Sequence, residues 1–320
     1  MRYLDFADGY LAYRTVMGMD ISLGPPICAE RNRTNCIHQF LAHTRKPVMT
    51  YLPGNILPDL TDTKLYVSSM GIDHYVDMDA LLRSPSKAVQ GALKKSDKAK
   101  FDIQALDFDL CTPEQLAKLK MISTVYLRNA QCTSELSFIN RPMQFHNDGM
   151  KRTFVLRKFD GETAGVFGYA VLNPYYTDGG VSGYLLDIIR FEPTRLWGVW
   201  LSTVWHFARM LAAQGYGLAL GFCPLYGLQS SATRSSRWLN WQTHCASRLL
   251  RNSRYVRRLY ELKSEIPGWQ EPRYFASYSR NLGMILLGFI NASGLTTRQL
   301  FGPELARSMV AGITTQRTMP

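Results

Sequence analysis

The sequence lacks the short motifs that mark the commonest catalytic and cofactor-binding sites. It contains no GxxxxGK[ST] and no GxGxxG, which argues against ATP hydrolysis and nicotinamide chemistry. It contains no GxSxG for a serine nucleophile. Its six histidines show neither HxxxH nor HxH spacing, and Cys36/His38 and His244/Cys245 each lack a second pair at ligand spacing. The sequence therefore predicts a protein without a metal site.

Paired cysteines and long apolar runs are also missing. The six cysteines are scattered with no CxxC, which favours reduced thiols in the cytosol. Asp5 and Asp8 stand where a signal peptide needs an apolar run. The longest uncharged stretch, residues 210–233, is interrupted by glycines and Pro224, so it does not read as a membrane span. We expect a cytoplasmic protein, and peripheral contact with the inner face of the membrane stays open.

Carboxylates are scarce in the second half of the chain. The formal net charge of +12 divides into +1 for residues 1–150 and +11 for residues 151–320. No Asp or Glu lies between Glu192 and Glu261, where nine arginines occur. Such a surface prefers polyanions, namely nucleic acid, anionic lipid or a phosphorylated cofactor. A solvated helical face is the structural alternative. The arginines at helical spacing are Arg248, Arg251, Arg254, Arg257 and Arg258.

The first hundred residues read as mixed α/β. Thr112 is a plausible N-cap with Pro113 at the first helical position, and it opens a helix toward Val125. We place a domain boundary there, between residues 1–111 and 112–320. The other expected elements are helices at 37–43 and 84–95, strands at 48–52 and 65–68, and a surface loop at 94–100.

The second half shows the element order of an acyltransferase core. Strands at 153–159 and 163–172 flank an Asp160-Gly161 hairpin turn, and a third strand follows at 181–191. Apolar residues at helical spacing then predict a helix over 196–213, and 218–222 is a short buried strand.

Five stretches in order give the chain a resemblance to a known family. They are 135–142 (ELSFINRP, with Arg152), 165–174, the D-x-x-R at 187–190, 221–225 (GFCPL) and 269–274 (WQEPRY). Together they resemble the C-terminal catalytic region of the bacterial aminoacyl-phosphatidylglycerol synthases, the multiple peptide resistance factors.

The resemblance implies an α/β fold of two tandem GNAT-like acyltransferase domains, each with a mixed central sheet flanked by helices. It implies an aminoacyltransferase that moves an amino acid from aminoacyl-tRNA to a hydroxyl or amine of a phosphatidylglycerol-like lipid or a small metabolite. No cofactor is expected. The activated ester leaves the site to hold the amino acid's ammonium group and to stabilise a tetrahedral oxyanion.

The resemblance also implies roles for residues. Asp187 would contact the donor's amino group, Arg190 would anchor a carboxyl-like or phosphate oxygen, and Lys263 is the local candidate for the family's lysine. Gln270 adds a residue inside the last motif. The residues expected to bind substrate are Glu135, Arg141, Arg195, Gly198 and Arg273. The five arginines from Arg248 to Arg258 would grip the tRNA acceptor arm or an anionic membrane.

Two other functions remain open at this stage. The segment from Arg195 to Trp200 partly matches [QR]-x-x-G-x-[GA], the loop on which GNAT enzymes bind the coenzyme A pyrophosphate. Arg195 and Gly198 fit, whereas Trp200 stands where a small residue is needed. An acyl-CoA-dependent N-acyltransferase is therefore the first alternative, and a non-catalytic protein that binds tRNA or an anionic membrane is the second. Asp187 and Arg190 could also be a structural ion pair.

Overall fold

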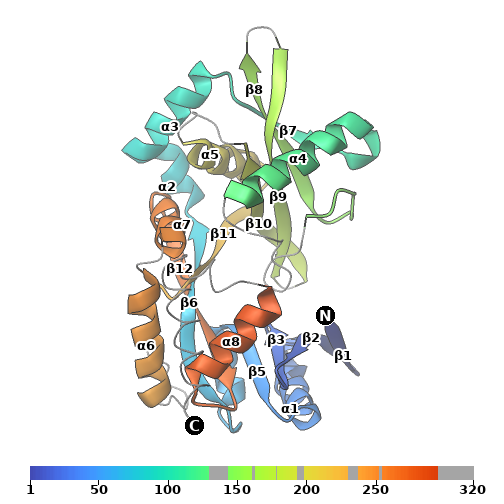
Figure 1. Ribbon diagram of the computed structural model, residues 1–320, viewed down its shortest axis with the longest axis vertical. Helices are drawn as coiled ribbons and strands as arrows, with labels where there is room; N and C mark the ends of the chain where they lie inside the picture. The colour runs from blue at the N-terminus through green and yellow to red at the C-terminus, as the bar shows by residue number, and fades with distance from the viewer. Residues whose placement is uncertain are drawn as a thin grey trace, which may run out of the picture.

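The computed structural model describes residues 1–129, 143–160, 163–177, 179–192, 198–229, 237–251 and 254–294. Its strands form one mixed sheet that runs the length of the molecule (Figure 1). The strand order is β1-β2-β3-β5-β12-β6-β11-β10-β9-β8-β7, with β4 paired to β2. The strands are β1 (Arg2–Phe6), β2 (Gly9–Val16), β3 (Met19–Leu23), β4 (Ile27–Cys28), β5 (Pro47–Pro53), β6 (Tyr66–Val76), β7 (Asp102–Leu106), β8 (Arg152–Asp160), β9 (Thr163–Thr177), β10 (Gly180–Phe191), β11 (Gly217–Pro224) and β12 (Gly268–Ser277).

Helices cover both faces of this sheet (Figure 1). They are α1 (Arg33–His43), α2 (Met78–Arg83), α3 (Lys87–Lys98), α4 (Pro113–Asn129), α5 (Val199–Ala212), α6 (Arg237–Arg251), α7 (Arg254–Ser264) and α8 (Leu282–Ser293). Three short 3-10 helices span Glu30–Asn32, Gly54–Leu60 and Phe108–Leu110. The predicted α/β class, a mixed sheet flanked by helices, is confirmed.

Two apolar layers enclose the end of the sheet formed by β7 to β11. On one face, α2, α3 and α5 cover the sheet, and Phe207 and Leu211 of α5 share a buried cluster with Leu186 of β10. On the other face, Leu119 and Ile122 of α4 belong to a cluster with Tyr169, Val171 and Ile188. Alternate residues of a strand point to opposite faces, so each strand contributes to both layers.

The other end of the sheet is enclosed in the same way. Phe40 of α1 packs on Leu11 and Met49 from one face. Ile285 of α8 and Leu239 of α6 belong to a separate buried cluster. The buried side of α6 also meets β6, because the Ser68 hydroxyl donates a 2.8 Å hydrogen bond to Asn240.

Elements from both sides of the predicted boundary at residue 111 are interleaved. β12 lies between β5 and β6, and β6 pairs with β11. β7 precedes residue 111 yet pairs with β8. One uninterrupted sheet thus contains strands from before and after residue 111. The division into domains 1–111 and 112–320 stays a prediction.

Several predicted limits differ from the structure. α3 continues to Lys98, so the expected loop at 94–100 is wrong over most of its length. Burial of Ala92 and Ser96, four residues apart, holds this last turn against the protein. The strand expected at 65–68 continues to Val76, and the helix from Pro113 continues to Asn129. Within the described ranges, no helix is long and apolar enough to cross a membrane.

Candidate functional site

The two parallel strands β10 and β11 separate after a short paired segment. They pair only over Gly183–Leu185 with Gly217–Ala219. Beyond that point β10 continues beside β9, while β11 continues beside β6. The sheet thus splays between the ends of β10 and β11, and the chain crosses from one to the other through α5 (Figure 1).

Asp187 lies on β10 just beyond the splay. The pairing of β10 with β9 shifts register between Leu186 and Ile188, so Asp187 sits in a bulge. Asn173 on β9 donates a 2.6 Å hydrogen bond from Nδ2 to Asp187 Oδ2. The Asn173 Oδ1 atom is buried and has no hydrogen-bond partner among the described residues. Two acceptor groups, a carboxylate and an amide oxygen, therefore lie together.

A small cavity opens beside Asp187. Its volume is about 30 Å³, and Ile188, Asp148 and Lys151 are among the residues that line it. Although partial burial opposes ionisation of Asp148, the Lys151 ammonium and two backbone N–H groups lower the pKa of Asp148 to about 2. The residues that line the cavity therefore include Asp187 and the ion pair between Lys151 and Asp148.

Arg190 is buried at the far end of β10, with 7% of its surface exposed. Its Nη1 donates a hydrogen bond to the Ser123 hydroxyl on α4. The same helix packs against Ile188, so Arg190 and Ile188 lie on the α4 face of the sheet. The guanidinium is held in place by its contact with α4.

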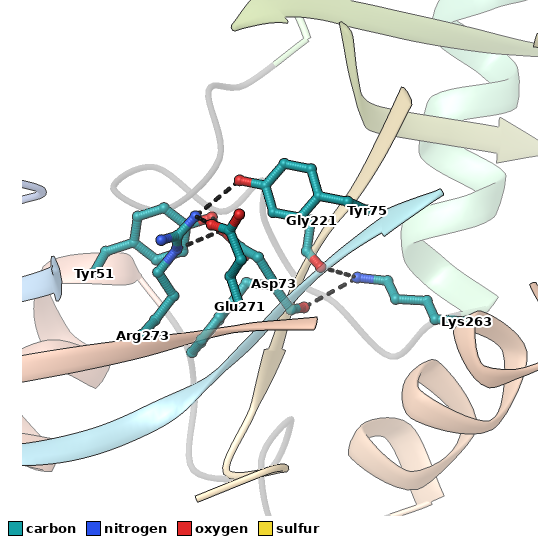
Figure 2. A network of polar contacts seen from close by, with 8 residues as sticks. Tyr51, Asp73, Tyr75, Gly221, Lys263, Glu271 and Arg273 are labelled. Atoms are coloured by element: carbon teal, nitrogen blue, oxygen red, sulfur yellow. Dashed lines mark hydrogen bonds and ion pairs between the residues drawn. The ribbon is translucent and has the colours of Figure 1, made fainter. Parts of the chain in front are cut away.

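Arg273 of β12 is the centre of a buried polar network (Figure 2). Its Nε donates to Asp73 Oδ2 at 2.7 Å, and its Nη2 donates to Tyr75 Oη at 2.9 Å and to Glu271 Oε2 at 3.2 Å. Tyr51 donates to the Asp73 carboxylate, 2.7 Å from Oδ1 and 2.6 Å from Oδ2. Although burial disfavours the charge, Asp73 and its neighbours raise the pKa of Arg273 above its ordinary value.

Aromatic rings surround this network. Tyr75 stacks on Trp269 with ring centroids 5.4 Å apart, and it meets Tyr175 edge-on at 6.1 Å. Burial raises the pKa of Tyr75 to about 12, so its hydroxyl stays protonated at neutral pH. Tyr51 adopts a left-handed backbone conformation (φ 58°), which a non-glycine residue rarely does and which local contacts must stabilise.

β9 connects the Asp187 region to the Arg273 network. Val171, Asn173 and Tyr175 are two residues apart along a strand, and they therefore point to one face, the face on which α4 packs. Asn173 bonds Asp187, and Tyr175 touches Tyr75, which bonds Arg273. The structure thus places Asp187 and Arg273 on the same face of the splayed sheet.

Lys263 reaches β11 from α7 and does not join the Arg273 network. Its Nζ donates to the carbonyl oxygens of Gly221 at 2.9 Å and Phe222 at 3.1 Å (Figure 2). Only 5% of its surface is exposed, and this burial lowers the pKa of Lys263. Gly221 has φ 75°, a conformation that favours glycine, so Lys263 holds an irregular point of β11. Its predicted catalytic role stays a prediction.

Gly198 precedes α5 with φ 86°. A Cβ atom there would lie 2.5 Å from Cβ of Ala92 on α3. Packing against α3 thus explains the glycine without a bound phosphate. Trp200 is half-buried against the core that α5 forms. Glu135, Arg141 and Arg195 lie outside the described residues.

The predicted basic residues lie on two consecutive helices. Arg248 is exposed on α6, and Arg257 is exposed on α7, where its Nε lies 2.6 Å from Glu261 Oε1. Arg251 belongs to α6, and Arg254 and Arg258 belong to α7, but their side chains are outside the described part of the structure.

Sequence reasoning missed most of the Arg273 network. Its members Tyr51, Asp73, Tyr75 and Glu271 were not among the predicted site residues, and neither was Asn173 beside Asp187. The available signal was a carboxylate, Asp73, inside the otherwise largely apolar stretch 65–76, because a buried charge needs a partner. In the described ranges, no group of three or more His, Cys, Asp or Glu residues could hold a metal ion.

The polar groups described above lie on two parts of one sheet. Asn173, Tyr175 and Asp187 are on β9 and β10, whereas the Arg273 network is on β5, β6 and β12. The model of the family "Phosphatidylglycerol lysyltransferase, C-terminal" matches residues 1–277, so the protein is a transferase of acyl or aminoacyl groups and the chain belongs to that family. The predicted family is confirmed.

Solved structures show the same fold. The C-terminal domain of a putative lysylphosphatidylglycerol synthetase from Agrobacterium fabrum matches with a TM-score of 0.70 and 17% identity, over 91% of this chain and 88% of that one. L-PGS from Bacillus licheniformis matches with a TM-score of 0.71 and 15% identity, over 92% of this chain and 90% of that one. A conserved protein of unknown function from Bacteroides thetaiotaomicron matches with a TM-score of 0.60 and 9% identity, over 86% of this chain and 84% of that one. No curated protein sequence matches this chain.

Proposed function

We propose that this protein transfers an aminoacyl group from aminoacyl-tRNA to a hydroxyl group of phosphatidylglycerol or a similar anionic lipid. Membership of the phosphatidylglycerol lysyltransferase family supports the reaction class and the lipid acceptor. The observation that carries the proposal for the site is the placement of Asp187 and Arg273 on one face of the splayed sheet, connected through Asn173 and Tyr175.

The donor's ammonium group would bind at Asp187. The Asp187 carboxylate supplies negative charge, and Asn173 Oδ1 is a buried acceptor without a partner among the described residues. An ammonium group donates up to three hydrogen bonds, so it would pair with the carboxylate and also donate to Asn173 Oδ1. The small cavity beside Asp187 suits a compact charged group of this kind.

The transfer itself needs no cofactor. The lipid hydroxyl oxygen attacks the ester carbonyl carbon, a tetrahedral oxyanion forms, and the bond to the tRNA ribose oxygen breaks. The proton of the lipid hydroxyl passes to that ribose oxygen, so the products are an aminoacyl lipid and free tRNA. Because the ester is already activated, positioning and oxyanion stabilisation supply most of the catalysis.

Tyr75 is our candidate for the oxyanion donor. Its oxygen accepts a hydrogen bond from Arg273, which leaves its own hydrogen for a substrate oxygen. The raised pKa of Tyr75 keeps that hydrogen in place at neutral pH. Arg190 would anchor a further substrate oxygen on the same face.

The tRNA would lie along α7. That helix carries exposed Arg257, and the sequence before Glu261 is free of carboxylates back to residue 193. Neutralising phosphates with arginine is the main source of affinity for nucleic acid.

The test is an incubation of the protein with vesicles containing phosphatidylglycerol and a pool of aminoacyl-tRNAs carrying labelled amino acids. Lipid extraction and chromatography should show labelled lipid, whereas free labelled amino acids plus uncharged tRNA should give none. If no aminoacyl-tRNA labels the lipid while an acyl-CoA is consumed with an amine acceptor, the donor in this proposal is wrong.

A further inference from the structure

α6 presents one exposed stripe to solvent. Its exposed positions among residues 237–248 are Arg237, Trp238, Trp241, His244 and Arg248. Positions 237, 241, 244 and 248 follow the spacing of one helical face. The buried positions Leu239, Thr243 and Ser247 lie on the opposite face, toward the protein. We call the five exposed residues the α6 stripe.

Two tryptophans dominate the α6 stripe. Trp238 is 57% exposed and Trp241 is 56% exposed. Their rings stack on each other, with centroids 4.9 Å apart and an interplanar angle of 17°. Large apolar side chains that stay this exposed mark a surface that meets another apolar phase or partner. We therefore expect another molecule or phase to cover the two tryptophans.

The charges around the pair are of one sign. Arg237 precedes Trp238, Arg248 ends the stripe, and α6 contains no carboxylate. Tryptophan is the residue that prefers the boundary between lipid headgroups and acyl chains, and arginines beside it attract anionic headgroups. The α6 stripe combines both preferences on one helix face.

The neighbouring helix distinguishes a membrane from nucleic acid. Gln242 of α6 accepts a 2.9 Å hydrogen bond from the backbone N–H of Leu282, the first residue of α8. α8 contains no charged residue, yet Met284 is 39% exposed and Leu287 is 48% exposed. Exposed aliphatic side chains gain nothing from a phosphate backbone, whereas they gain from acyl chains.

We propose that the α6 stripe, with Met284 and Leu287 of α8, docks the protein on an anionic lipid bilayer. This inference rests on the proposed function for the identity of the lipid, since the acceptor lies in that bilayer. β6 connects the docking surface to the site: Ser68 contacts α6, and Asp73 lies five residues further, roughly 17 Å along an extended strand.

The experiment measures vesicle binding by the full chain. Binding is compared on vesicles of phosphatidylcholine alone and of phosphatidylcholine with phosphatidylglycerol, by flotation. The test variant is Trp238→Ala/Trp241→Ala. The control is Tyr3→Ala/Tyr10→Ala, which removes a second exposed aromatic pair, in this case with edge-on rings, on β1 and β2. Thermal unfolding checks that both variants are folded.

We expect the unmodified protein to bind the anionic vesicles and the tryptophan variant to bind them more weakly by about tenfold or more, because two indoles leave the interface. The tyrosine variant should bind like the unmodified protein. Vesicles with brominated acyl chains should quench tryptophan fluorescence in the unmodified protein far more than in the tryptophan variant.

Unchanged vesicle binding of the tryptophan variant would overturn the proposal. So would a variant that loses affinity for tRNA while keeping its affinity for vesicles, because the stripe would then be a nucleic-acid surface. Transfer to short-chain, monomeric phosphatidylglycerol separates the two proposals. If the unmodified protein shows no transfer to it, the proposed function fails, whatever the vesicles show.

Discussion

The buried ion pair between Arg273 and Asp73 provides a sharp test of the network on the α4 face. Arg273→Met removes the guanidinium and keeps much of the side-chain volume. Asp73, only 4% exposed, then keeps the Tyr51 hydroxyl as a hydrogen-bond donor but loses its cationic partner. Removing one member of a buried pair costs about 3–5 kcal/mol, because the other charge stays buried and uncompensated.

Asp73→Asn should cost less than Arg273→Met. Arg273 would keep its hydrogen bonds to Tyr75 and Glu271. Water can reach the Arg273–Glu271 pair, because the Glu271 side chain is 45% exposed. The double variant Asp73→Asn/Arg273→Met no longer buries an unpaired charge. Its loss should therefore fall short of the sum of the single losses by about 2 kcal/mol.

These free energies of unfolding are measured by urea titration, with far-UV circular dichroism as the probe. The pair joins residues 200 positions apart, on β6 and β12, so its loss should affect the cooperative unfolding of the whole sheet. A loss below about 1 kcal/mol for Arg273→Met, or strict additivity in the double variant, would show that the network does not hold these strands together.

Three further predictions concern stability and binding. Burial lowers the pKa of His74 and His206 below 6.5, so the folded state binds fewer protons than the unfolded state and unfolding becomes easier as the pH falls through 6.5. Between pH 7.5 and 5.5 the loss of unfolding free energy is at most about 1.4 kcal/mol per histidine. His206→Gln should reduce this loss in urea titrations at the two pH values. Gly198 has φ 86° and lies close to Ala92, whereas Gly215 has φ 74° and open space around it. Gly198→Ala should therefore lower the free energy of unfolding by about 1–3 kcal/mol more than Gly215→Ala. Equal losses for the two variants would show that the contact with Ala92 has no energetic effect. Affinity for tRNA should fall steeply between about 50 and 200 mM salt, and a profile that does not change with salt would show that α7 does not bind the tRNA phosphates.

Local signals in the sequence predicted the elements that have local causes. Thr112 and Pro113 open α4 as expected: the Thr112 hydroxyl accepts from the Gln115 N–H, and Gln115 reaches back to the Thr112 N–H. This reciprocal capping arrangement is readable from neighbouring residues alone. The strands of the hairpin and the helix of the splay were predicted for the same reason.

Long-range pairing was not readable. β12 inserts between β5 and β6, more than 190 residues away, and no local pattern reports this. The role of Arg273 was therefore predicted only from the family motif, while its partners Asp73, Tyr51 and Tyr75 were missed. Lys263 shows the converse: the motif predicted a catalytic group, and the structure gives its ammonium two backbone carbonyl partners on β11.

The single-turnover rate of aminoacyl transfer to phosphatidylglycerol reports whether Asp187 binds the donor. Asp187→Asn keeps the shape of the side chain and removes the charge that would bind the donor's ammonium group. We expect a transfer rate lower by about a hundredfold or more, with unchanged thermal stability, while exposed Asp79→Asn on α2 transfers at the normal rate. An Asp187→Asn protein that transfers as fast as the unmodified one would show that the donor's ammonium group binds elsewhere.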